Sequence, residues 1–180
     1  SLKLDQNQHP INFVEHNDEG IVTSEFNSLI LGFGDTAKEA LAYLYEYGAF
    51  IGEDGNRSKF HCTIIDKNIE IKKGTYLSQR PALKDSDLLT FENLGIGTAD
   101  YWQKIDTIAD KLNYVIIAMG EDRLNISTAI DLFNYCYRKR EGKLDNFAIY
   151  IRLHKDSNLK FVKKIINYYK VDNNEYIRVF

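Results

Sequence analysis

The sequence predicts a doubly wound α/β fold, in which helices cover both faces of one mainly parallel sheet. From residue 26 to the end of the chain, short apolar runs alternate with amphipathic helix patterns, and the connections between them are short. The run at 60–65 is too apolar for an exposed edge and indicates a central parallel strand. We expect one domain over 26–180, preceded by an arm or hairpin over 1–25.

The expected strands are short apolar runs bounded by polar or glycine-bearing segments. They cover 26–31, 60–65, 88–91, 113–120, 147–153 and 176–179. Two further strand-like pieces, at 11–14 and 20–24, flank a turn-prone segment in the N-terminal arm.

The expected helices each place apolar residues on one face at helical spacing. Their stripes are Ala37, Leu41, Leu44 and Gly48; Tyr101, Ile105, Ile108 and Leu112; Ile126, Ile130, Phe133 and Tyr137; and Leu159, Val162, Ile166 and Tyr169. Residues 69–84 stay ambiguous, because Gly74 and Pro81 interrupt a weak helical pattern.

A glycine turn joins the first strand to the first helix. The segment Gly32-Phe33-Gly34-Asp35-Thr36-Ala37 has the spacing G-x-G-x-x-A, which places a pyrophosphate on backbone N–H groups at a helix N-terminus. Gly32 permits the turn, Gly34 lets the backbone approach the phosphates, and Ala37 lets the helix pack on the strand. Asp35 puts a negative charge beside the phosphate position, or caps the helix.

Asp66 follows the second strand, where an acidic residue accepts hydrogen bonds from the ribose of a nucleotide. Its distance from the glycine turn exceeds the usual spacing of about 20 residues, and the polar segment 52–59 has the character of an insertion. A carboxylate here favours NAD(H) over NADP(H), because it repels a 2′-phosphate, although the adjacent Lys67 opposes this preference. Strand, turn, helix and acid together predict a Rossmann-like dinucleotide or adenine-nucleotide site.

Composition and charge exclude several classes of partner. A net charge of −3 argues against a dedicated nucleic-acid binder, and no apolar run is long enough to span a membrane. Cys62 and Cys136 form no C-x-x-C pair and are expected to be buried, reduced thiols, and His9 and His16 lack metal-ligand spacing. The chain begins with Ser1 and its one methionine is Met119, so we expect a piece of a longer protein.

The fourth strand and its continuation, from Asn113 through Met119 and Gly120 to Asn125 and Ala129, resemble the TrkA-N domain, also called the regulator-of-potassium-conductance (RCK) domain. The resemblance extends to the glycine turn, to the strand end Ile65-Asp66-Lys67 and to the strand at 149–152, so it covers roughly residues 26–155.

This resemblance implies a cytoplasmic regulatory domain that senses NAD(H), with ATP or ADP as alternatives. It implies that Met119, Gly120 and Asn125 line the ligand crevice opposite the glycine turn. It further implies a homodimer or larger ring that controls potassium transport, a membrane transporter or a fused output domain. A sensor of this kind needs a ligand that binds two arrangements differently, and no catalytic residue.

Three other readings remain. An NAD(P)-dependent oxidoreductase would use Tyr135 and Lys139, which form Y-x-x-x-K, but this pair follows the wrong strand. A methyltransferase would need an acidic residue before Gly32, where the chain is apolar. A domain that has lost its ligand would fill the crevice with side chains, for which Phe33 and Tyr76 are candidates. His61 and His154 are potential bases without a paired nucleophile.

Overall fold

The computed structural model describes residues 8–48, 50, 52, 55, 60–84, 87–155 and 158–180. It contains one six-stranded, all-parallel sheet with the strand order β3-β2-β1-β4-β5-β6. The strands are β1 (Phe26–Leu31), β2 (Phe60–Ile65), β3 (Leu89–Glu92), β4 (Leu112–Ile117), β5 (Ala148–Ile151) and β6 (Ile177–Val179). This is the strand order of a Rossmann-like doubly wound sheet, so the predicted fold class is confirmed.

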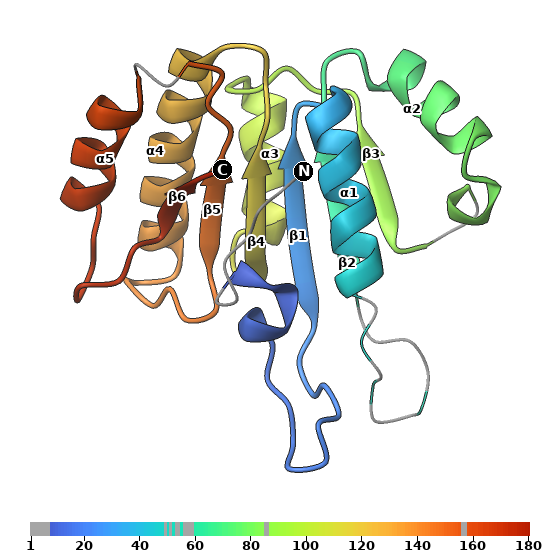
Figure 1. Cartoon of the computed structure of the whole chain (residues 1–180), viewed down its shortest axis with the longest axis horizontal. Coiled ribbons are helices and arrows are strands. Elements are labelled where there is room, and N and C mark those ends of the chain that lie inside the picture. The colour runs from blue at the N-terminus through green and yellow to red at the C-terminus, as the bar shows by residue number, and fades with distance from the viewer. Residues whose placement is uncertain are drawn as a thin grey trace.

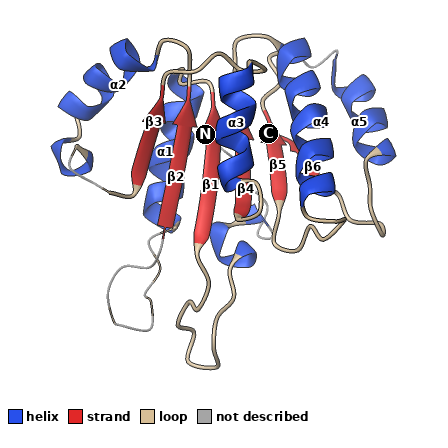
Figure 2. Cartoon of the chain, turned by 180° about the vertical axis from the view of Figure 1, so that it is seen from behind, coloured by secondary structure: helices blue, strands red, loops and turns tan. Residues whose placement is uncertain are grey.

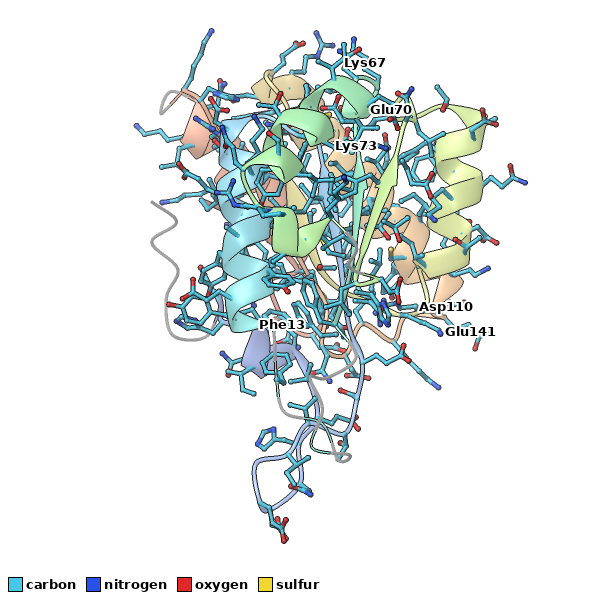
Figure 3. All side chains as sticks on the ribbon, turned by 90° about the vertical axis from the view of Figure 1, so that its right-hand side faces the viewer. Phe13, Lys67, Glu70, Lys73, Asp110 and Glu141 are labelled. Carbon is cyan, nitrogen blue, oxygen red and sulfur yellow. The ribbon has the colours of Figure 1, made fainter. Side chains whose placement is uncertain are left out.

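Helices cover both faces of the sheet and form three layers, seen from the side in Figure 3. Helices α1 (Asp35–Tyr47) and α2 (Ile69–Ser78) pack against one face, as the core cluster around Ile30, Ile64 and Leu41 shows. Helices α3 (Ala99–Ile108), α4 (Asp122–Lys139) and α5 (Leu159–Tyr168) share the other core cluster. Figure 1 looks onto the face that carries α1, and Figure 2 onto the face that carries α3 and α4.

All six strands run in the same direction, so their carboxyl ends meet at one edge of the sheet, at the top of Figure 1. Chain connections leave β1 toward β2 and β3 on one side, and toward β5 and β6 beyond β4 on the other. The order of strands therefore reverses between β1 and β4, at the carboxyl ends of these two strands. In open α/β sheets, ligands bind in the crevice that forms at this point.

The central strands are buried on both faces, which explains why their sequences are almost continuously apolar. Leu29, Ile30 and Leu31 of β1 and Val115 and Ile117 of β4 have no measurable exposure. Parallel strands buried in this way carry apolar residues at successive positions, and the alternation of one-sided sheets is lost. The expected burial of both cysteines is confirmed, and Cys62 and Cys136 are free thiols.

Several predicted element boundaries differ from the structure. Residues 11–14, expected as a strand, belong mostly to a 3-10 helix, Pro10–Phe13, because Pro10 fixes the first φ angle and Phe13 packs on Tyr114. Leu112, expected as the last residue of the second helix stripe, instead begins β4. The ambiguous stretch 69–84 forms α2 and a second 3-10 helix, Pro81–Leu83.

Strands β4 and β5 are shorter than expected. β4 ends at Ile117 rather than at 120, and β5 covers Ala148–Ile151 rather than 147–153. The residues that follow the two observed strands, 118–120 and 152–153, form loops at the carboxyl edge of the sheet. On α4 the expected stripe is confirmed at Ile126 and Phe133, which are buried, and Ile130 packs against the same core cluster. Tyr137, the last residue of the stripe, is exposed instead, and the buried face also includes Ala129, Leu132 and Cys136.

The N-terminal arm bends back as a hairpin below the sheet, at the edge opposite the strand carboxyl ends (Figure 1). His16 and Val22 form an isolated antiparallel bridge, and the Asn17 side chain accepts hydrogen bonds from the N–H groups of Glu19 and Ile21. The hairpin expected in 1–25 is therefore present from residue 14 onward. Of the expected insertion at 52–59, only Gly52 and Gly55 lie within the described residues.

Candidate functional site

A cleft of about 1110 Å³ opens at the carboxyl edge of the sheet, above the point where the winding reverses. The glycine turn, the segment after β2, the ends of β4 and β5 and the residue after β6 all contribute to it. Its lining residues are Gly32, Phe33, Gly34, Asp35, Thr36, Glu39, Asp66, Lys67, Asn68, Lys72, Gly95, Ile96, Ala118, Met119, Gly120, Leu124, Arg152, Leu153, His154 and Phe180. Lys67 marks this edge in Figure 3, and Phe13 lies at the opposite end.

The two glycines of the turn differ in whether the surrounding protein requires glycine at their positions. Gly32 has φ +86°, and a Cβ there would lie 3.0 Å from the Ala118 carbonyl oxygen, so the position requires glycine. Gly34 has an ordinary φ of −85°, and a Cβ there would meet nothing within 4 Å. Protein packing therefore does not explain Gly34, whereas a ligand approaching the backbone from the cleft does.

Gly34 is also the N-cap of α1 and has no side chain with which to cap the helix. The N–H groups of the first helical turn are therefore available to an external acceptor, and the helix dipole favours a negative one. Asp35 extends into solvent with a side chain 98% exposed and pairs with Lys38 at 3.4 Å. Ala37 is fully buried and brings α1 close to the sheet, as expected.

Asp66 ties the glycine turn to the start of α2. Its Oδ2 accepts hydrogen bonds from the Phe33 backbone N–H at 2.8 Å and from the Lys72 ammonium at 2.6 Å. Its Oδ1 accepts one from the Asn68 backbone N–H at 2.7 Å. A carboxylate offers about four lone-pair sites, so Oδ1 retains one for a further donor such as a ribose hydroxyl.

These contacts also fix the charge of Asp66. Burial acts to raise the pKa of this carboxyl, but the hydrogen bonds from Lys72, Asn68 and Phe33 outweigh burial and leave the pKa below its ordinary value. Asp66 is therefore ionised at neutral pH and matched by one positive charge. Lys67 is exposed beside it in the cleft wall.

The opposite wall of the cleft comes from the end of β4. It is lined by Met119 and Gly120, the two residues that the resemblance places at the ligand crevice. Asn125 is fully buried and stands behind this wall: its Oδ1 accepts from the Met119 N–H, and its Nδ2 donates to the carbonyl oxygens of Met119 and Arg152. The Asn125 amide thus joins the ends of β4 and β5 by hydrogen bonds. Because the side chain is fully buried, its position does not fit the predicted direct contact with a ligand.

Asp122, at the first position of α4, holds the loop that follows β5. Its Oδ1 accepts from the His154 N–H at 2.6 Å, and its Oδ2 accepts from the Lys155 N–H at 3.1 Å and from the Asn158 amide at 2.8 Å. Burial acts to raise the pKa of Asp122, but these hydrogen bonds outweigh it and lower the pKa. The His154 ring in turn lies 2.9 Å from the Met119 carbonyl oxygen through Nε2.

The cleft therefore contains most of the predicted residues and several that were not predicted to bind ligand. Lys72, Arg152, Glu39 and Phe180 reach it from four different elements or their ends, together with His154, which the sequence indicated only as a potential base. Arg152 was detectable by the rule that found Asp66, since it directly follows a strand. Lys72 lies in the first turns of a helix that the sequence left ambiguous, and it had no comparable signal.

Side chains of the glycine turn do not fill the cleft. Phe33 is fully buried, and its ring packs edge-on against Tyr76 at 5.3 Å and Phe91 at 5.8 Å, on the side of α2. The Tyr76 side chain lies in the same core, under the Arg80 guanidinium. The two residues suspected of blocking the crevice thus stabilise the turn from behind and leave the cleft open.

Tyr135 and Lys139 lie far from the cleft, on the surface between α3 and α4. Both donate to Asp106 Oδ1, at 2.5 Å and 2.8 Å, and the Trp102 ring stacks on Tyr135. Tyr135 follows the cleft residue Leu124 by three turns of α4, or about 16 Å along the axis. The hydrogen bond to Asp106 raises the pKa of Tyr135, the opposite of what proton transfer by this tyrosine would need.

Among the described residues, no group of three or more histidine, cysteine or acidic side chains is arranged to hold a metal ion. In the same part of the chain, no helix has the length and apolar character needed to cross a membrane. Comparison of the sequence with protein-family models and with curated proteins returned no match.

Proposed function

We propose that this domain binds NAD(H) or an adenine nucleotide in the carboxyl-edge cleft and acts as a regulatory sensor of the TrkA-N type. The observation that carries the proposal is the open, uncapped N-terminus of α1 at Gly34, which faces a cleft in a Rossmann-like sheet. A phosphate group there would accept hydrogen bonds from the free N–H groups and benefit from the helix dipole.

The remainder of the nucleotide follows from the same geometry. The adenosine ribose would lie over the end of β2, where Asp66 Oδ1 retains an acceptor site. The part beyond the phosphates would extend across β4, along the wall made by Met119 and Gly120. Phe33 and Tyr76 pack against each other and leave room for this ligand. Their position supports nucleotide binding over the alternative of a domain that has lost its ligand.

Regulation is the part of the proposal that rests on the resemblance. A sensor acts by binding its ligand more tightly in one arrangement of its subunits than in another. We propose a homodimer or larger ring on the cytoplasmic side of a membrane, coupled to potassium transport or to a fused output domain. The surface position and raised pKa of Tyr135 support this reading over that of an oxidoreductase built on Y-x-x-x-K.

Calorimetric titration of the chain with NAD, NADH, NADP, ADP, ATP and S-adenosylmethionine tests the proposal. We expect saturable binding of at least one adenine nucleotide with one site per chain, and a change in oligomer size or shape when the same nucleotide is present during size-exclusion chromatography. Absence of binding by all six compounds would overturn the binding proposal. Turnover with a panel of carbonyl substrates and NAD(P)H would replace the sensor with an oxidoreductase.

A further inference from the structure

Arg152 occupies a fixed position at the end of β5, on the same side of the sheet as α1. Its N–H donates to the Ile117 carbonyl oxygen at 2.9 Å, and its own carbonyl oxygen accepts from Asn125 at 3.0 Å. Alternate β5 residues face opposite sides, and Ala148 and Tyr150 belong to the core cluster beneath α1. Arg152 continues this alternation, so its side chain extends toward the side on which α1 begins.

The Arg152 guanidinium has no hydrogen bond or ion pair to any residue that the structure describes, although the side chain is half-buried in the cleft wall. Other arginines that are half-buried have partners. Arg140 donates to the carbonyl oxygens of Ala109 and Leu112, and Arg178 donates to the Tyr150 hydroxyl. A half-buried cation without a partner, which faces a cleft, indicates an anionic group of the ligand.

The distance between the glycine turn and Arg152 indicates which anionic group of the ligand would reach the guanidinium. β5 lies two strands beyond β1, so the Arg152 backbone is about 10 Å from the glycine turn. A first phosphate at the turn would direct its chain of further phosphates over β4, toward the long Arg152 side chain. A guanidinium binds phosphate with two parallel hydrogen bonds, which gives both strength and direction.

Resting on the proposed nucleotide site, we propose that the cleft selects an adenosine di- or triphosphate, and that Arg152 binds its terminal phosphate. The nicotinamide of a dinucleotide would place an uncharged or positively charged ring near this guanidinium, which provides no matching partner. Arg152 is thus the residue that distinguishes a polyphosphate chain from a monophosphate.

Titration of the whole chain with AMP, ADP, ATP and NADH tests this assignment, in wild type and in Arg152→Gln. We expect wild type to bind ADP or ATP at least about tenfold more tightly than AMP, the effect of one charge-assisted hydrogen-bonded pair. Arg152→Gln should reduce this ratio to near one, and Arg152→Lys should restore part of it. Arg138→Gln is the matched control, since it removes one positive charge at the far end of α4.

Unfolding curves show whether each variant is folded before its affinities are compared. If Arg152→Gln leaves the ratio of ATP to AMP affinity unchanged, or if wild type binds NADH more tightly than ADP and ATP, the role of Arg152 is overturned while the nucleotide site stands. If none of the four ligands binds wild type, the proposed function itself fails. Binding of any of the four ligands by wild type thus distinguishes a failure of the Arg152 assignment from a failure of the proposed function.

Discussion

The Lys72 ammonium lies 2.6 Å from Asp66 Oδ2, so the acid at the end of β2 is paired with a cation inside the cleft wall. The same oxygen accepts from the Phe33 N–H, which couples this ion pair to the glycine turn. The ribose position therefore presents a neutralised carboxylate with exposed Lys67 beside it. This arrangement weakens the discrimination against a 2′-phosphate that an unpaired acid would give.

Replacing Lys72 by methionine should sharpen the preference for NAD(H) over NADP(H). The unpaired Asp66 carboxylate would then repel a 2′-phosphate, and the ratio of the two affinities should rise by about fivefold, the effect of one charge pair at close range in a wet site. Calorimetric titration measures the ratio. Lys73→Met is the control, because Lys73 pairs with Glu70 and does not line the cleft. An unchanged ratio of the two affinities in Lys72→Met would contradict the placement of the ribose next to Asp66.

Gly34→Leu should abolish nucleotide binding and leave the fold intact. The backbone at Gly34 suits any residue, and the added side chain would occupy the space proposed for phosphate. Gly74→Leu on α2 is the matched control, since a Cβ there also meets nothing and the position lies outside the cleft. Unchanged nucleotide affinity in folded Gly34→Leu would remove the glycine turn from the mechanism.

Gly32→Ala should show the opposite pattern, with a loss of stability. The positive φ alone costs about 1–2 kcal/mol for alanine, and its Cβ would lie 3.0 Å from the Ala118 carbonyl oxygen. Chemical denaturation measures the free energy of unfolding. Wild-type stability in this variant would contradict the turn geometry described above.

The two halves of the cleft differ in how far the sequence could predict them. The glycine turn and Asp66 directly follow strands, and their chemistry depends on local backbone geometry, so residue type and order were sufficient. The opposite wall depends on how β4, β5 and β6 come together. Arg152 and Phe180 meet there because β5 and β6, which α5 separates in the chain, pair as neighbours in the sheet.

Asn125 shows a further limit of the sequence. Its position near the start of α4 suggested a ligand contact, but a buried amide can equally satisfy backbone groups, and only the tertiary structure decides between the two. The segment at 11–14 differs from the expected strand for a related reason. Its apolar residues fit a strand, while Pro10 and the packing of Phe13 on Tyr114 favour a 3-10 turn.

Asn125→Leu should destabilise the domain by about 3 kcal/mol, because it leaves three hydrogen bonds to buried backbone groups unmade. Nucleotide affinity should fall as well, since the variant loses the hydrogen bonds of Asn125 that position Met119 and Arg152 at the ends of β4 and β5. Asn134→Leu, on the same helix, is the control. Thermal unfolding and nucleotide titration together test this prediction. A variant with wild-type stability and normal affinity would contradict the structural role of Asn125.

Asp122→Asn should make the stability less dependent on pH in the acidic range. The folded pKa of Asp122 lies below its unfolded value of about 3.9, so its contribution is fully present above that pH and is lost as the pH falls through the folded pKa. At pH 7 the variant should be less stable than wild type by about 1–2 kcal/mol. The difference in stability between variant and wild type should shrink as the pH falls below the unfolded pKa and through the folded one. Denaturation curves measure this, and a constant difference across the acidic range would exclude the linkage.

Amide chemical shifts of the isotope-labelled chain, recorded while ADP is added, would locate the bound nucleotide residue by residue. We expect saturable shifts at the N–H groups of the first turn of α1 and around Asp66, and at Met119 and Arg152 across the cleft. The surface around Trp102 and Tyr135, on α3 and α4, should show none. Absence of shifts at saturating ADP and NADH, or shifts confined to that surface, would contradict a nucleotide site at the carboxyl edge of the sheet.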